Sequence, residues 1–122
     1  MESPFKGETG LRRLINAFGY SADGLEAAFQ HEDAFRQEVF LACVLIPLGL
    51  YWGKTNIEKV MLAGAIILVL IVELLNSSIE ATVDHTSVEC HPLAKRAKDI
   101  GSSAVFLTLI NFFLVWGLVL FS

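Results

Sequence analysis

The chain has 122 residues, of which 54% are hydrophobic and 18% charged, with a formal net charge of −4. This apolar composition excludes a disordered chain, and two cysteines are too few for a disulfide scaffold. A nucleic-acid partner is also excluded, because no basic stripe with interleaved aromatic residues occurs. The apolar residues gather in three blocks, residues 39–53, 60–79 and 100–122, whose only charged side chain is Glu73. The composition therefore predicts an integral membrane protein.

The segment before the first apolar block has apolar residues at helical spacing, namely Leu11, Leu14, Ile15, Phe18, Leu25 and Phe29. Charged residues such as Arg12 and Asp23 fall on other faces. This pattern predicts an amphipathic surface helix over about residues 10–30. We expect it to lie in the membrane interface, and the alternative is a helix packed on its own neighbours.

Each apolar block can form a membrane-spanning helix, which needs roughly 17–25 mostly apolar residues. We predict spans at about residues 37–53, 58–82 and 99–121. The first is short and contains Pro47, whereas the second places Glu73 at hydrocarbon depth. The prediction is an all-α membrane protein in which residues 1–122 form a single domain.

Three spans put the two termini on opposite sides of the membrane, and the side richer in Lys and Arg faces the cytoplasm. One side holds only Lys54 and Lys59. The other holds Lys6, Arg12, Arg13, Arg36, Lys95, Arg96 and Lys98. The N-terminus and the loop over residues 84–99 are therefore expected to be cytoplasmic.

Four polar residues of the second span, Glu73, Asn76, Glu80 and Asp84, share one helical face at i, i+3, i+7 and i+11. A carboxylate in the bilayer costs at least about 2.5 kcal/mol, so Glu73 should be neutral, paired or next to a polar cavity. It could be protonated and hydrogen-bonded across helices, with Asn76 and Ser77 joining the contact. It could instead be an intramembrane acid or base below carboxylates that hold a cation. Two carboxylates and an amide suit Mg²⁺, which also binds substrate phosphates.

The loop before the last span mixes hydrogen-bond donors and acceptors suited to phosphate and ribose groups. It contains Glu89, Cys90, His91, Lys98 and Asp99. The alternative interpretation is a solvated loop with the usual positive charge of the cytoplasmic side. A zinc site is not favoured, because the sequence has no second Cys/His pair at the required spacing.

Three segments resemble the small integral-membrane bacterial diacylglycerol kinases: residues 32–38, residues 72–81 with Asp84, and residues 97–104. The middle segment places Glu-x-x-Asn-x-x-x-Glu inside a span. The resemblance covers almost the whole chain and implies a multi-pass homotrimer in the bacterial inner membrane, with active sites between neighbouring subunits. It also implies Mg²⁺-dependent transfer of the ATP γ-phosphoryl group to diacylglycerol, giving phosphatidic acid at the cytoplasmic face.

Matching positions carry the family's functional residues onto this sequence. Glu73 would be the base that accepts the lipid hydroxyl proton, Glu32 and Glu80 would ligate Mg²⁺, and Asn76 and Asp84 would support them. The implied ATP contacts are Arg13, Tyr20, Glu32, Glu80, Glu89, Cys90, His91, Lys98 and Asp99. The implied lipid contacts are Arg13, Ser21, Phe35, Arg36, Glu38, Glu73, Ser102 and Trp116.

The acceptor lipid is left open by departures from the family pattern. Cys90 stands where an aromatic residue is expected, and residues 91–95 look like the related undecaprenol kinases. Residues 19–21 and 35–38 look closer to the diacylglycerol kinases, which we favour. Undecaprenol phosphorylation remains the alternative reaction.

Outside enzymes, the alternative is a small oligomeric channel or proton path lined by Glu73, Glu80 and Asp84. It would explain the acidic face of the second span. It would not explain the segment at residues 32–38 or the Lys98 and Asp99 pair.

Overall fold

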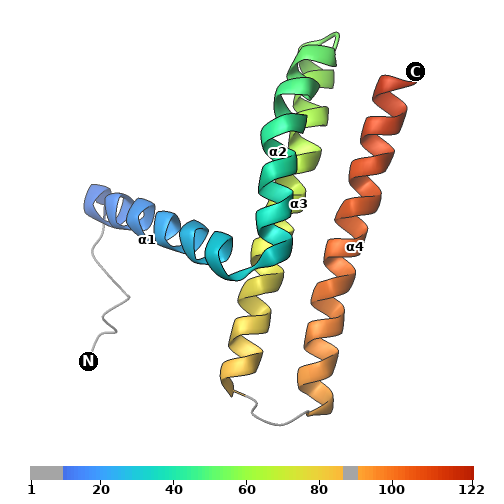
Figure 1. Cartoon of the computed structure of the whole chain (residues 1–122). Helices are drawn as coiled ribbons and strands as arrows, with labels where there is room; N and C mark the ends of the chain where they lie inside the picture. Colours follow the sequence, from blue (N-terminus) through green and yellow to red (C-terminus); the bar gives the residue numbers. More distant parts are fainter. Residues whose placement is uncertain (1–9, 87–90) are drawn as a thin grey trace.

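The computed structural model describes residues 10–86 and 91–122, and these form four α-helices without a strand (Figure 1). The helices are α1 (Gly10–His31), α2 (Asp33–Trp52), α3 (Asn56–Thr86) and α4 (Pro92–Leu120). α2, α3 and α4 run side by side, whereas α1 leaves the bundle sideways (Figure 1). The predicted all-α architecture is confirmed.

The three bundle helices are each long and apolar enough to cross a membrane. α3 continues to Thr86 and α4 already begins at Pro92, so both extend past the apolar blocks at the end of the bundle that lies beyond α1 (Figure 1). The apolar pattern marks the stretch suited to hydrocarbon, whereas the helix itself persists into polar sequence. Pro92 suits the first turn of α4 because its missing N–H would have no helical partner there.

α3 is the central helix, since both α2 and α4 pack against it. The three helices pack most closely at the end away from α1, around Leu62, which is 0% exposed. Gly49 of α2 lets the two backbones approach here, because a Cβ at this position would lie 3.0 Å from the Cβ of Leu62. The indole Nε1–H of Trp116 on α4 donates to the Leu62 carbonyl at 3.0 Å. These contacts therefore join all three helices at one point.

α1 has a different character, because Ala28 is its only buried residue. Leu11, Ile15 and Phe18 are well exposed in the protomer. The helix predicted over about residues 10–30 is present, and it meets the bundle only near its C-terminal end (Figure 1).

Candidate functional site

The candidate site begins at the elbow between α1 and α2, where Glu32 is the single residue outside both helices. Its backbone is extended, with φ −116° and ψ 107°. The Glu32 N–H donates to the Ala28 carbonyl at 2.9 Å, and its own carbonyl accepts from the Arg36 N–H at 3.1 Å. The backbone of this carboxylate is therefore held by the last turn of α1 and the first turn of α2.

A groove of about 720 Å³ runs from this elbow between α1 and α3. Its polar lining is Ser21, His31 and Glu32 on one side and Ser77 and Ser78 of α3 on the other. The remaining lining is apolar or small. A groove with a few polar groups among apolar ones suits an amphiphilic ligand.

Glu73 lies on α3 with only 6% of its surface exposed. Its Oε2 atom is buried and has no hydrogen-bond partner among the described residues. It is close enough to Glu32, Glu38 and Glu80 for electrostatic interaction. Oε2 of Glu38, on α2, is likewise buried without a partner. Carboxylates from α2, α3 and the elbow thus converge around Glu73.

Asn76 lies one turn beyond Glu73 and is held by both α3 and α4. Its Nδ2 donates to Oε1 of Glu80 at 2.8 Å. Within the described part of the chain its buried Oδ1 has no hydrogen-bond partner, and a Cβ on Gly101 would overlap this atom. Glycine at position 101 therefore makes room for the Asn76 amide, which in turn orients Glu80.

Beyond Glu80, ion pairs organise the ends of α3 and α4. Lys98 Nζ of α4 lies 2.7 Å from Oδ1 of Asp84 on α3. Within α4, Lys95 Nζ lies 2.7 Å from Oδ2 of Asp99. His91 caps this helix, since its Nδ1 accepts from the Leu93 N–H at 3.0 Å. Such exposed pairs add little stability, so their effect is to orient the side chains.

The remaining predicted contacts are more scattered. Arg13 and Tyr20 are exposed on α1, Ser102 is exposed on α4, and Phe35 is buried at the start of α2. Trp116 lies at the opposite end of the bundle, where its indole is buried and already donates to Leu62. Glu89 and Cys90 fall outside the described residues.

Comparisons with known proteins show the family of the chain. A model of the prokaryotic diacylglycerol kinase family matches residues 19–120. A diacylglycerol kinase of Pseudomonas aeruginosa is 52% identical over 118 residues, which cover 97% of this chain and 96% of the relative. The chain belongs to the prokaryotic diacylglycerol kinase family. The diacylglycerol kinase of Haemophilus influenzae is 50% identical over 113 residues, covering 93% of this chain and 96% of the relative. That of Escherichia coli is 43% identical over 114 residues, covering 93% of each chain.

Membership of this family confirms the predicted resemblance and identifies the chain as an enzyme, a phosphotransferase. Together with the three apolar helices it makes the chain a multi-pass membrane protein. The matched region includes Glu32, Glu73 and Glu80.

The roles of two parts of the site were not predicted from the sequence. Gly101 lies inside the predicted 97–104 segment, but its role depends on the packing of α4 against Asn76 of α3. Ser77 was considered only for a polar contact between helices, and Ser78 was not predicted at all, whereas both line the groove between α1 and α3. The one local signal for Gly101 was a glycine inside a segment with helical character, two residues after Asp99.

Proposed function

We propose that this chain transfers the γ-phosphoryl group of ATP to the hydroxyl group of diacylglycerol and so forms phosphatidic acid. The observation that carries the proposal is the convergence of Glu32, Glu73 and Glu80 near a groove between α1 and α3. The names of the relatives support diacylglycerol as the acceptor. The channel alternative has no comparable support, because it leaves the family and the position of Glu32 unexplained.

Glu73 is the proposed general base. Its buried Oε2 has no hydrogen-bond partner among the described residues and would accept the proton of the lipid hydroxyl group. Because the acyl chains hold the lipid at a fixed depth, the bilayer itself brings the hydroxyl towards this carboxylate. A positioned base of this kind contributes about 10²- to 10⁴-fold to the rate.

The side chains around Glu73 fit Mg²⁺. Glu32 and Glu80 would hold it, and their carboxylate oxygens are the ligands that this ion prefers. The described residues contain no group of three or more His, Cys, Asp or Glu arranged around a metal ion. Mg²⁺ needs only a small number of protein ligands, because it takes one or two carboxylates and completes its coordination with phosphates and water. When bound, it would offset the negative charge of the phosphoryl oxygens.

The nucleotide would lie at the end of the bundle where Asp84 of α3 pairs with Lys98 of α4. Lys98 and Asp99 are held there by ion pairs, and His91 caps α4. Glu80 and Asn76 face the same region from α3. We propose that Arg13, Tyr20, Glu32, Glu89 and Cys90 complete these contacts.

For the lipid, the groove offers Ser21 and Ser77 near the reacting end. Exposed apolar residues of α1 suit a helix lying in the membrane interface, where it would cover the glycerol backbone. The other proposed lipid contacts are Arg13, Phe35, Glu38, Ser102 and Trp116.

We further propose a homotrimer in the bacterial inner membrane, with the N-terminus and the sites on the cytoplasmic side. Tyr20, which is 64% exposed, and Ser102 both leave room for a neighbouring subunit to complete the site. The excess of Lys and Arg at the α1 end supports the orientation.

The test is transfer of labelled γ-phosphate from Mg-ATP into lipid by purified protein in bilayers that contain diacylglycerol and undecaprenol together. We expect the label in phosphatidic acid. Label in undecaprenyl phosphate would identify the other acceptor. No label in either lipid, with the helical fold intact by circular dichroism, would refute the kinase proposal.

A further inference from the structure

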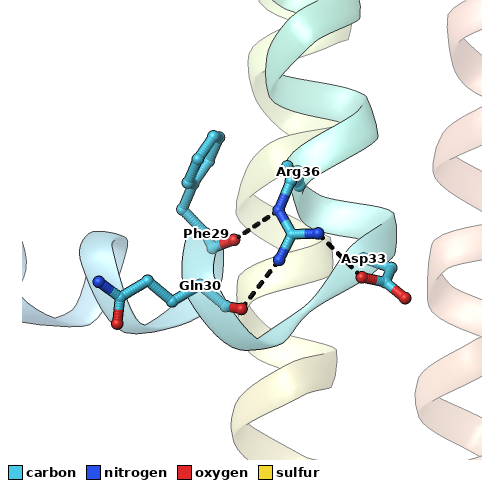
Figure 2. Close-up of polar contacts among 4 residues, drawn as sticks. All are labelled: Phe29, Gln30, Asp33 and Arg36. Carbon is cyan, nitrogen blue, oxygen red and sulfur yellow. Dashed lines mark hydrogen bonds and ion pairs between the residues drawn. The ribbon is translucent and has the colours of Figure 1, made fainter.

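Arg36 makes an unusual set of contacts at the elbow, shown in Figure 2. Its Nε donates to the Phe29 carbonyl at 2.9 Å and its Nη2 donates to the Gln30 carbonyl at 2.8 Å. Its Nη1 lies 3.0 Å from Oδ1 of Asp33. Three of the five N–H donors of the guanidinium are thereby engaged within the protein.

These contacts join two helix ends. The Phe29 and Gln30 carbonyls lie in the last turn of α1, where carbonyl groups have no partner within the helix. A cation at this end also interacts favourably with the helix dipole. Asp33 lies in the first turn of α2, where a negative charge is favoured for the same reason. One side chain thus closes α1 and connects it to the start of α2.

Side-chain packing adds to this connection. The guanidinium carbon of Arg36 lies 5.8 Å from the centre of the Phe29 ring. That ring packs edge-on against Phe40, one turn further along α2, with centres 5.7 Å apart. The last turn of α1 is therefore held by both polar and aromatic contacts to the same face of α2.

The residue enclosed by these contacts is Glu32. Arg36 holds it twice, through its backbone N–H bonded to the Glu32 carbonyl and through its side chain on the preceding turn. Without the guanidinium, α1 would be free to turn about the extended residue at the elbow, and the direction of the Glu32 carboxylate relative to Glu73 would no longer be fixed.

We propose that Arg36 is a positioning residue: it fixes the angle between α1 and α2 and thereby holds the Glu32 carboxylate towards the acidic residues of α3. The consequence for Mg²⁺ rests on the proposed function of Glu32, whereas the elbow angle can be measured without any activity. Lysine cannot replace arginine here, because one ammonium group does not reproduce the planar fork that reaches two carbonyls and a carboxylate.

The elbow is tested by a distance between two spin labels on the full chain in bilayers. One label is placed at Asp23→Cys on α1 and the other on the native Cys43 of α2, in a Cys90→Ser background diluted with unlabelled protein; both labelled positions are exposed. The parent should give one narrow distance distribution. Arg36→Gln should broaden and displace it, and Arg36→Lys should do so to a smaller degree. Arg96→Gln, which removes an exposed positive charge of α4, is the matched control and should leave it unchanged.

The second readout separates positioning from lipid binding by kinetics of the unlabelled variants. We expect Arg36→Gln to raise the Mg²⁺ concentration needed for half-maximal activity by about 10- to 100-fold, as for a residue that orients a metal ligand. The KM for diacylglycerol should change by less than about twofold, because the contacts that bind the lipid substrate are not altered. Arg36→Lys should restore part of the Mg²⁺ affinity.

Each alternative gives a distinct result. An unchanged distance distribution in both Arg36 variants would overturn the proposal. A raised KM for diacylglycerol with an unchanged Mg²⁺ requirement would make Arg36 a lipid contact instead. If the parent protein has no kinase activity, the proposed function fails, but the distances still decide the role of the elbow. If Arg36→Gln does not fold, the decision rests on Arg36→Lys.

Discussion

The two ends of the helical bundle are built in opposite ways. At the end around Leu62, Gly49 and Trp116, the core is closely packed and the buried indole N–H has its acceptor. Towards α1, buried oxygens of Glu38, Glu73 and Asn76 have no hydrogen-bond partner among the described residues. Buried polar groups without partners are costly, and such groups often belong to functional sites. The difference between the two ends shows that one end is packed for stability, whereas the other holds the polar groups on which the proposed chemistry depends.

Replacing Glu73 with glutamine should produce the largest effect on activity. Glutamine keeps the shape of the side chain but cannot act as the base, so turnover should fall by about 100-fold or more. Nucleotide binding, followed by a fluorescent ATP analogue, should be largely kept. Glu58→Gln at the opposite end is the control with the same change of charge. Turnover close to that of the parent would show that Glu73 is not the base.

The Mg²⁺ ligands should show the next largest effect. In Glu32→Gln and Glu80→Gln the apparent Mg²⁺ affinity should fall by about 10-fold or more, since loss of a ligand costs at least as much as loss of an orienting partner. A Mg²⁺ titration of initial rates measures this. Asp33→Asn should do much less, because its side chain is 88% exposed and the amide oxygen can still accept from Arg36. Identical titrations for all three variants would argue against ligation.

Gly101→Ala should have a moderate effect that shows how α4 supports the site. The added methyl would overlap Oδ1 of Asn76, so the amide must turn and release Glu80. We expect activity to fall by about 10-fold, as for loss of an orienting contact. Gly117→Ala is a matched control on the same helix, since a Cβ there meets nothing within 4 Å. Equal activity of the two variants would contradict the assigned role of Gly101.

Gly49→Ala should affect stability instead of turnover. The new Cβ would lie 3.0 Å from that of Leu62 and 3.4 Å from the Trp116 ring. Overpacking of this kind costs typically about 1–3 kcal/mol. Thermal unfolding in detergent, compared with Gly64→Ala of α3 where a Cβ meets nothing within 4 Å, gives the difference. An equal unfolding temperature for the two variants would mean that α2 can shift without loss of stability.

Much of this architecture follows from the sequence. Hydropathy predicted the three long helices because the apolar blocks are long and nearly free of charge. Helical periodicity placed Glu73, Asn76 and Glu80 on one face, and the structure brings the first and last together electrostatically. Such predictions succeed because they depend only on residues close in sequence.

Contacts between helices could not be predicted in the same way. The pairing of Asp84 with Lys98 depends on the approach of α3 and α4. Two of the contacts of Arg36 are with backbone carbonyls, which carry no sequence signal. The hydrogen bond from the Trp116 indole to the Leu62 carbonyl likewise depends on the approach of α3 and α4. Family resemblance names such residues but does not show what they touch.

The most direct test of the difference between the two ends measures turnover and unfolding free energy together for Glu73→Gln and Gly49→Ala. We predict opposite results: Glu73→Gln loses turnover and keeps or gains stability, because it removes a buried unpaired carboxylate. Gly49→Ala should lose stability and keep its turnover. The opposite result for Glu73→Gln would contradict this difference between the two ends. That result is a loss of stability as large as that of a packing mutation, with phosphatidic acid still formed at the rate of the parent.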